Sequence, residues 1–529
     1  MPHSRLRLLR ISFCVGLSCL ITSCTYLQNF YRQAGYSKIQ KTSPSQLNLK
    51  HMIDRQTFFV YGLILDEAND YSGLSFMVVA YSNRYKTNEV VDSTYVAHAG
   101  THYGLNLPVG QHDLMVFADQ NKNNIFEQSE AVGRRQIQLS VATHPDKVVN
   151  DIDIPLSEQE PMDWIVNTPV PEVAQTRESL FYPKGTIRQL DDPLFDLDIA
   201  TLGMYEPAAF LELAPTMFYA LEEDSYKVPV LFVHGIGGSA REFVSIVDRL
   251  DRQRYQSWFF YYPSGNDLDQ LAEIFYDIFL SGKVNRRGEM PIVIVAHSMG
   301  GLVVREALNQ YRGDKHENRV GLLITIASPL DGHPSAAAGE KRAPLVLPSW
   351  RDLNPESTFI KRLFRKPLPS GVNHHLIYTY LNPKKLVQGK GDDGIVPTSS
   401  QLRPDAKRQS TQQFGFNNSH TGVLRGEDAI ERIIQSINKV KSAYPESHLK
   451  ILMAGGYDVD LNNGYSDKEK YYIRTMGEYL YALTNGTLYT LGSPVLERFV
   501  EVAQGEAKAK SDPETAWLKF VNDYPQYGE

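Results

Sequence analysis

The stretch Pro291–Val304, which reads PIVIVAHSMGGLVV, limits the possible folds of this chain more than any other. Its first half is a run of β-branched apolar residues, typical of a strand that is buried on both faces. Its second half is apolar again and begins a helical pattern. A short AHSMGG segment joins the two, so the turn must be tight, and the small residues Ala296, Gly300 and Gly301 permit it.

Ser298 lies at the centre of this turn and allows two interpretations. It is either a nucleophile whose hydroxyl projects from the top of a sheet on a strained turn, or a small residue at an ordinary buried turn. The usual motif begins with Gly, and here Ala296 costs only one extra methyl group. The pattern alone does not decide, because it should occur by chance in roughly one chain in three of this length.

Further apolar runs around this stretch predict an α/β fold over residues 180–444. Helical patterns such as Asp267–Ser281 and Leu302–Tyr311 lie between these runs, so we expect a mainly parallel sheet covered by helices. The predicted strands are Val228–Val233, Trp258–Tyr262, Pro291–Val295, Gly321–Ile326 and His375–Tyr380.

The flanking parts of the chain have other patterns. Short alternating strands recur between Phe58 and Leu139 and predict a β-sandwich over residues 51–157. This segment loosely resembles transthyretin-like and carboxypeptidase-regulatory modules. A Pro-containing linker is expected over 158–179. Residues 445–529 read as helical, with a capping box at Ser466–Glu469.

The N-terminus has the pattern of an export signal. Arginines precede a short apolar run, Ile11–Ile21, which is too short to favour a membrane-spanning helix. The following Thr22-Ser23-Cys24 resembles the lipobox of bacterial lipoproteins, which implies a signal peptide over 1–23, a lipidated Cys24 and a tether over 24–50. A plain cleaved signal and an uncleaved anchor are the alternatives. Thr25 is not the Asp of the inner-membrane retention signal, so the resemblance implies an outer-membrane location in the bacterial cell envelope.

Charge and cysteine content narrow the functional classes. The net charge is −7 and no basic block occurs, so nucleic-acid binding has no electrostatic support. The three cysteines all lie at the N-terminus, and cleavage before Cys24 would leave one. A lipidated Cys24 leaves no thiol for a disulfide, so the exported chain would depend on burial of its core.

A glycine-rich turn, Val233–Ser239, directly follows the predicted strand Val228–Val233. Acyl-transfer chemistry needs backbone N–H groups that point at the developing oxyanion, and glycine permits that close approach. We expect the donors to be the N–H groups of Ile236 and Met299. The alternative is that the glycines serve packing alone.

A serine nucleophile also needs a base, and the base needs an orienting carboxylate. Downstream of Ser298, the segment Gly391–Pro397 offers Asp392 and Asp393, and a Gly- and Asn-flanked loop offers His420. The base should precede a helix, here Ala429–Val440. Four other histidines are poorer candidates, since two lie at a predicted strand and two are expected to shape the site: His374, His375, His234 and His297.

Four ordered segments together resemble the lipase-like branch of the α/β-hydrolase superfamily, near the PGAP1-like hydrolases. They are His234–Gly238, Ala296–Gly301, Asp393–Pro397 and His420–Gly422. The resemblance covers residues 180 to 440. It implies that Ser298 is the nucleophile, that Asp393, immediately before Gly394, is the acid, and that His420 is the base. It implies no cofactor and no metal.

The resulting expectation is a membrane-tethered serine esterase or lipase that acts on carboxylic esters, with acyl lipids as the expected substrates. An acyltransferase that uses the same acyl-enzyme is one alternative. A non-catalytic envelope lipoprotein that only binds a partner is the other, and the sandwich has no identified partner. An insertion over 331–373 is either a mobile lid or a fixed cap.

Asp119–Glu130 matches the ligand pattern of an EF-hand calcium loop at several positions. EF-hands need flanking helices, whereas both flanks here read as strands. An Asn- and Asp-rich hairpin turn is therefore the preferred interpretation. A similar pattern at Asp458–Glu469 is better explained by the helix cap.

Overall fold

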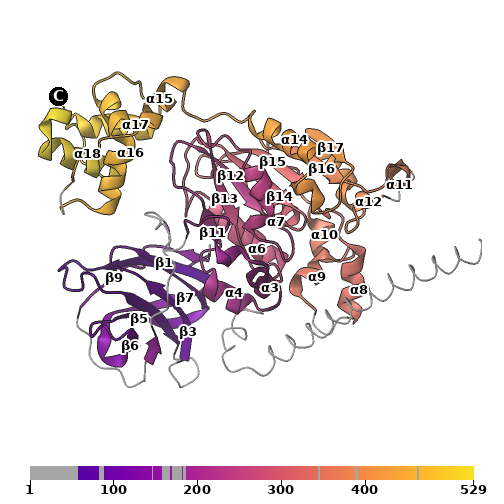
Figure 1. Ribbon diagram of the computed structural model, residues 1–529, viewed down its shortest axis with the longest axis horizontal. Helices are drawn as coiled ribbons and strands as arrows, with labels where there is room; N and C mark the ends of the chain where they lie inside the picture. Colours follow the sequence, from indigo (N-terminus) through magenta and orange to yellow (C-terminus); the bar gives the residue numbers. More distant parts are fainter. Residues whose placement is uncertain are drawn as a thin grey trace, which may run out of the picture.

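The structure is a computed structural model of the chain. It describes residues 57–82, 89–145, 147–157, 167–169, 182, 186–342, 346–387, 391–461 and 464–528. The predicted signal peptide, Cys24, the tether and most of the predicted linker lie outside these ranges. Strands come first, an α/β part follows and helices end the chain (Figure 1).

Two four-stranded sheets form the N-terminal part. One has the order β4-β1-β8, with β9 also paired to β1, and the other is the antiparallel sheet β3-β2-β5-β7. Apolar side chains from both sheets, such as Phe58, Val78 and Val116, share one buried core. The strands are β1 (Thr57–Leu65), β2 (Phe76–Ser82), β3 (Glu89–Val96), β4 (His102–Pro108), β5 (Gly110–Ala118), β7 (Ala131–Leu139), β8 (Val148–Val149) and β9 (Ile154–Pro155).

The Asp119–Glu130 loop connects β5 to a short strand, β6 (Ile125–Glu127), which pairs with β10 (Asn167–Pro169). The Asp119 carboxylate accepts the backbone N–H groups of Asn123 and Asn124, both at 3.1 Å. Glu130 accepts the N–H of Gln120 at 2.8 Å. The loop's own backbone therefore uses both terminal carboxylates, and among the described residues no group of three acidic, His or Cys side chains is placed to hold a metal ion.

The α/β part is built on a seven-stranded sheet with the order β11-β13-β12-β14-β15-β16-β17. Strand β11 is antiparallel to β13, and the other neighbours are parallel. Strand β12 lies between β13 and β14. The chain therefore continues from β12 toward one edge of the sheet and from β14 toward the other, which opens a crevice at the carboxyl ends of these two strands. The strands are β11 (Phe218–Ala220), β12 (Val228–Val233), β13 (Tyr255–Phe260), β14 (Ile292–His297), β15 (Val320–Ile326), β16 (Asn373–Thr379) and β17 (Gln412–Phe416).

Helices accompany this sheet. The expected helix Asp267–Ser281 is α6 (Leu268–Phe275), which the Asp267 side chain caps, followed by a π-helical turn at Tyr276–Leu280. The helix after Ser298 is α7 (Gly300–Ala307). The others are α3 (Leu197–Tyr205), α4 (Pro207–Leu213), α5 (Val244–Val247), α11 (Pro383–Val387), α12 (Thr398–Gln401), α13 (Pro404–Gln409) and α14 (Glu427–Ile437).

The insertion over 331–373 contains α8 (Pro334–Arg342), α9 (Pro348–Leu353) and α10 (Thr358–Arg362). Helix α9 is held against α6, since the Asp352 carboxylate accepts the Leu268 N–H at 2.8 Å. Phe359 and Ile360 of α10 are buried in the main core. Helices α9 and α10 thus have the packing of a fixed cap, whereas most of α8 is partly or fully exposed.

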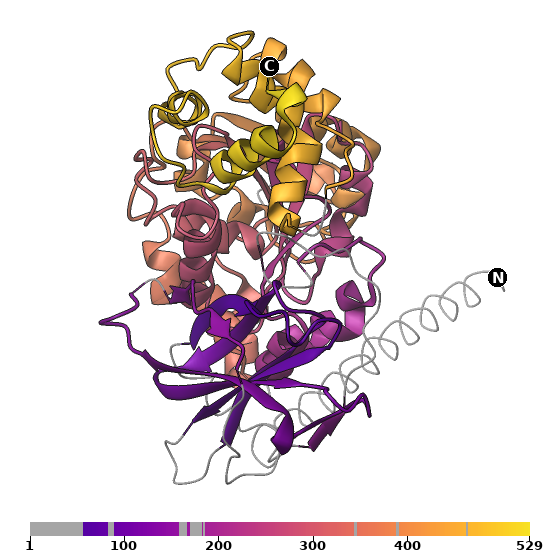
Figure 2. The ribbon, with the colours of Figure 1, turned by 90° about the vertical axis from the view of Figure 1, so that its left-hand side faces the viewer.

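The C-terminal helices are α15 (Glu446–Ala454), α16 (Asp467–Thr484), α17 (Pro494–Ala503) and α18 (Asp512–Asp523), packed around their own core with Trp517 and Phe520. The capping box between Ser466 and Glu469 is formed. In Figures 1 and 2 these helices and the N-terminal sheets lie on the same side of the α/β part, near β11. None of the helices in the described ranges combines the length and apolarity needed to cross a bilayer.

Candidate active site

Ser298 follows β14 directly and has a φ of +52°, in the left-handed region that residues other than glycine rarely adopt. Its N–H donates to the carbonyl of Ile326 at the end of β15, at 2.8 Å. Close neighbours leave no room for relaxation. A Cβ on Gly300 would lie 2.5 Å from the carbonyl oxygen of Val233, so α7 and β12 meet at their backbones. The turn therefore has the geometry of a nucleophile elbow.

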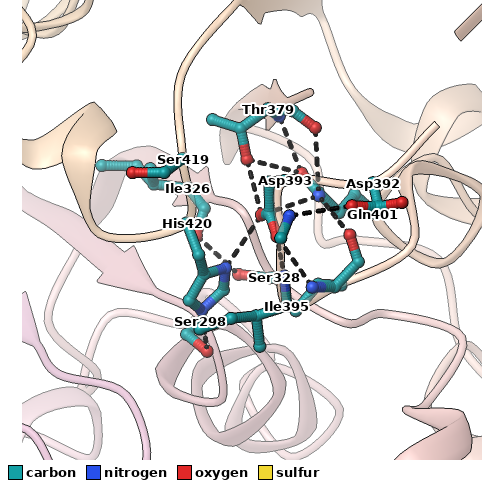
Figure 3. Close-up of polar contacts among 12 residues, drawn as sticks. Ser298, Ile326, Ser328, Thr379, Asp392, Asp393, Ile395, Gln401, Ser419 and His420 are labelled. Atoms are coloured by element: carbon teal, nitrogen blue, oxygen red, sulfur yellow. Dashed lines mark hydrogen bonds and ion pairs between the residues drawn. The ribbon is translucent and has the colours of Figure 1, made fainter. Parts of the chain in front are cut away.

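The predicted acid and base meet this serine. Nε2 of His420 lies 2.9 Å from Ser298 Oγ, and its Nδ1 lies 2.8 Å from Oδ2 of Asp393 (Figure 3). Asp393 follows β16, and His420 follows β17. The carboxyl ends of neighbouring parallel strands thus bring together residues that are far apart in the sequence. All three side chains are at least nine-tenths buried.

Asp393 is held from both sides. Oδ2 accepts hydrogen bonds from Thr379 Oγ1 at 2.7 Å and Gln401 Nε2 at 3.0 Å (Figure 3). Oδ1 accepts the N–H groups of Ile395 and Val396 at 3.0 and 2.7 Å. Burial raises the pKa of this carboxyl, but the hydrogen bond and charge of His420, together with the other donors, outweigh burial and lower it overall. An ionised Asp393 requires Nδ1 of His420 to be the protonated nitrogen, which leaves Nε2 to accept from Ser298.

Asp392, the other candidate acid, points elsewhere. Its Oδ1 accepts the N–H of Gly394 at 3.0 Å, and the residue is exposed. Thr379 and Gln401 have no sequence signal of their own. The fold alone brings them to Asp393, from β16 and α12 respectively.

A second histidine lies beside the base. His297, the residue before Ser298, places Nε2 3.0 Å from the backbone carbonyl oxygen of His420 and Nδ1 3.1 Å from Oε1 of Glu242. When the Glu242 carboxylate is ionised, both hydrogen bonds require a doubly protonated ring. Glu242 Oε1 also accepts the Gly235 N–H at 3.3 Å. No motif in the sequence points to Glu242.

The pKa of His297 follows from this arrangement. Burial lowers it, but the Glu242 charge and hydrogen bond, with the His420 carbonyl, outweigh burial and raise it above its ordinary value. The Glu242–His297 pair thus joins three parts of the site: the glycine-rich turn, the elbow and the loop that carries the base.

The other three histidines considered as candidates, which are His234, His374 and His375, have structural contacts. Nδ1 of His234 donates to the Gly235 carbonyl at 2.7 Å, and Nε2 accepts the N–H of Tyr262 at 3.3 Å. Burial lowers its pKa to about 4, so the ring is neutral and braces the glycine-rich turn. His374 and His375 lie within β16, and His374 Nε2 is 2.8 Å from Thr325 Oγ1.

The two expected oxyanion donors lie at the same cavity as Ser298. Within the described part of the chain, the N–H groups of Ile236 and Met299 have no hydrogen-bond acceptor. The next N–H along the turn is occupied, because Gly237, with a φ of +64°, donates to Ser264 Oγ at 2.9 Å. Two backbone donors are thus available beside the nucleophile.

A cavity of about 460 Å³ opens over Ser298. The insertion forms one wall with Ala336, Trp350 and Leu353, and the acid loop contributes Ile395, which is 57% exposed. The cavity therefore offers an apolar surface next to two N–H donors and a serine hydroxyl.

Comparison with known proteins agrees with this architecture. Residues 228–415 match the family model described as alpha/beta hydrolase fold. A GPI inositol-deacylase from Candida albicans is 27% identical in an alignment of 123 residues, and the match covers 19% of this chain and 31% of that protein. The matched segment thus spans about a third of the length of that curated relative. The chain therefore contains an α/β-hydrolase fold, with a sheet that is parallel except at β11.

Similar solved structures include two lipases. The mature form of Bacillus licheniformis lipase BlEst2 is 17% identical, covering 42% of this chain and 97% of that chain with a TM-score of 0.32. Aspergillus fumigatus lipase B is 18% identical, covering 45% and 59% of the two chains with a TM-score of 0.33.

The Glu242–His297 pair predicts a pH-dependent stability. Because the pKa of His297 is raised on folding, the stability from the pair is complete below its unfolded value of about 6.5 and is lost as the pH rises through the folded value. Glu242→Gln should therefore lower the free energy of unfolding by about 1–2 kcal/mol near pH 6 and by less near pH 9. Denaturant unfolding across this range measures the difference.

Glu356→Gln is the matched control, since the Glu356 carboxylate is exposed and pairs with Lys361. Its small effect should be constant over the same pH range. A Glu242→Gln effect that is constant, or that grows with pH, would contradict the charge assignment of His297.

Proposed function

We propose that the chain is a serine hydrolase that cleaves carboxylic esters, of the lipase or esterase type, through an acyl-enzyme on Ser298. One observation carries the proposal: Ser298 Oγ lies 2.9 Å from His420 Nε2 on a left-handed turn. An alcohol becomes a useful nucleophile when a positioned base removes its proton during attack. The unused N–H groups of Ile236 and Met299 support the same reaction.

In the first step, Ser298 Oγ attacks the ester carbonyl carbon and its proton passes to Nε2 of His420. The Asp393 carboxylate, 2.8 Å from Nδ1, keeps the ring in the required tautomer and stabilises the imidazolium that forms. The N–H groups of Ile236 and Met299 stabilise the negative oxygen of the tetrahedral intermediate.

The intermediate then collapses. The bond between the carbonyl carbon and the alcohol oxygen breaks, and the leaving alcohol takes the proton from Nε2 of His420. Water attacks the acyl-enzyme with His420 as base again, which releases the carboxylic acid and restores Ser298.

The proposed substrates are acyl lipids. The apolar wall of Ala336, Trp350 and Leu353 suits an acyl chain that enters beside Ser298. The Candida albicans relative is named GPI inositol-deacylase, and an acyl ester is the corresponding substrate class that we propose for this chain.

The activity predicts covalent labelling by a fluorophosphonate probe, which reacts with activated serines. The wild-type protein should be labelled with one equivalent, whereas Ser298→Ala and His420→Ala should not. Both variants should lower kcat on short acyl esters by about 10⁴-fold or more.

Ser335→Ala is the matched control, because Ser335 lines the same cavity without contacting the three reacting groups. It should keep the labelling of the wild type. Labelling that survives in Ser298→Ala would exclude Ser298 as the nucleophile, and loss of labelling in Ser335→Ala would point to a different serine.

We also propose that the enzyme works at a membrane surface, tethered by a lipid on Cys24. The lipobox-like Thr22-Ser23-Cys24 sequence supports this anchor, and an anchored enzyme would meet acyl lipids at the surface that contains them. The proposed location is the outer membrane of a bacterial envelope.

Metabolic labelling with an alkynyl fatty acid in a diderm bacterial host tests the anchor. The wild type should incorporate the label, Cys24→Ser should not, and Cys19→Ser should behave as the wild type. Thr25→Asp should move the labelled protein from the outer to the inner membrane fraction. Incorporation of the label into Cys24→Ser would refute lipidation at this residue.

A further inference from the structure

A second cavity, of about 340 Å³, lies at the opposite end of the sheet from Ser298. Its lining includes Gln256, the second residue of β13, and the segment Glu223–Ser225, which precedes β12. These are the amino ends of parallel strands, whereas Ser298 follows the carboxyl end of β14. The cavity is therefore separate from the proposed active site.

Several parts of the chain that are distant in sequence form this cavity. Edge strand β11 contributes Phe218, the loop after the π-helical turn contributes Asn285 and Arg287, and α16 contributes Tyr472. Helix α16 is fixed there by neighbouring contacts, since the Tyr471 hydroxyl donates to the Glu223 carbonyl at 2.7 Å. The C-terminal helices thus complete a site that the α/β part forms only in part.

Arg287 is the unusual group of this cavity. Its Nη2 donates to the carbonyl oxygens of Ser225 at 2.8 Å and Lys227 at 3.2 Å, and its guanidinium lies 5.4 Å from the ring centroid of Trp258. No carboxylate of the described chain lies within ion-pair distance of it. Its Nε–H has no acceptor. Burial lowers its pKa, and the opposing effect of Asp224 and the nearby tyrosines is smaller.

Asn285, two residues before Arg287, also has a buried hydrogen-bond donor without an acceptor. Its side chain is 5% exposed, and its Nδ2 donor has no hydrogen-bond partner. Buried polar groups are almost always paired in folded proteins. Two neighbouring residues with unused donors, one of them positively charged, indicate that the missing partner is an acceptor with negative charge.

Asp224, the carboxylate at the cavity whose charge acts on Arg287, already has a partner. Asp224 is 2.7 Å from Lys227 Nζ, which neutralises it locally. Arg286 adds a second positive charge at the rim, and Glu223 also lines the cavity. The remaining wall is partly aromatic and includes Phe218 and Trp258, each 3% exposed.

We propose that this cavity binds a small ligand with an oxyanion group, a carboxylate or a phosphate, which pairs with Arg287 and Asn285 while its apolar body packs on Trp258, Phe218 and Tyr472. A planar guanidinium matches the two oxygens of such a group. The site is independent of chemistry at Ser298, and occupancy would tie α16 to the α/β part.

Isothermal titration of the full-length protein tests the site with three probes: inorganic phosphate, hexanoate and the cation hexyltrimethylammonium. At least one anion should bind saturably, and the cation should not. Phosphate alone would assign a phosphate ester as the ligand, and hexanoate alone would assign a carboxylate with an apolar chain.

Asn285→Asp is the decisive variant, because it is nearly isosteric and places a carboxylate in the cavity wall. It should weaken anion binding by about 10- to 100-fold, the equivalent of one charge-assisted hydrogen bond. Arg287→Lys, which keeps the charge but loses the planar fork, should weaken binding by about tenfold. Arg312→Gln removes a charge from an exposed loop elsewhere and should leave the affinity unchanged.

A carboxylate could also enter the cavity beside Ser298, but Asn285→Asp leaves that cavity unaltered. Equal affinity in Asn285→Asp and the wild type would therefore overturn the proposal. So would binding of neither anion at about 10 mM, or saturable binding of the cation. Phosphonate labelling of Ser298, measured separately, does not depend on any of these results.

Discussion

The crowded crossing of β12, β14 and α7 is the constraint on which the proposed active site depends. A left-handed Ser298 is a conformation that costs of the order of 1–3 kcal/mol and persists only where the surroundings enforce it. Here a side chain on Gly235 would lie 2.8 Å from Ser298 Cβ, and one on Gly301 would lie 2.1 Å from Ser328 Oγ. Because these glycines have no side chains, the backbones can approach each other closely. This packing holds the Ser298 backbone in the conformation that directs its hydroxyl out of the sheet.

The base is held by a different principle, which is hydrogen bonding between loops. Asp393 fixes the His420 ring through Nδ1, and the backbone N–H of His420 donates to the Asp393 carbonyl at 3.0 Å. His297 binds the His420 carbonyl from the other side and connects it to Glu242. Elbow, glycine-rich turn and base loop therefore share one buried polar network, in which each member restricts the others.

The α/β-hydrolase fold was predictable because each central strand is a nearly continuous apolar run beside a turn of small residues. The positions of Ser298, Asp393 and His420 were predictable because loops at the carboxyl ends of adjacent parallel strands must converge. Thr379, Gln401 and Glu242 were not, since ordinary polar residues gain their roles only through tertiary contacts. The helix predicted to start at Asp267 does begin there, with Asp267 as its capping residue. Its π-helical last turn and the burial of α10 could not be predicted, because both depend on tertiary packing and leave no periodic pattern in the sequence.

A crystal structure of the protein after reaction with a phosphonate ester would show directly whether Ser298 is the nucleophile beside these two N–H donors. Phosphorus should be bonded to Ser298 Oγ, with one phosphoryl oxygen about 2.7–3.1 Å from the N–H groups of both Ile236 and Met299. His420 should remain hydrogen-bonded to Asp393. Phosphorus on another residue, or a phosphoryl oxygen directed away from both N–H groups, would contradict the proposed mechanism.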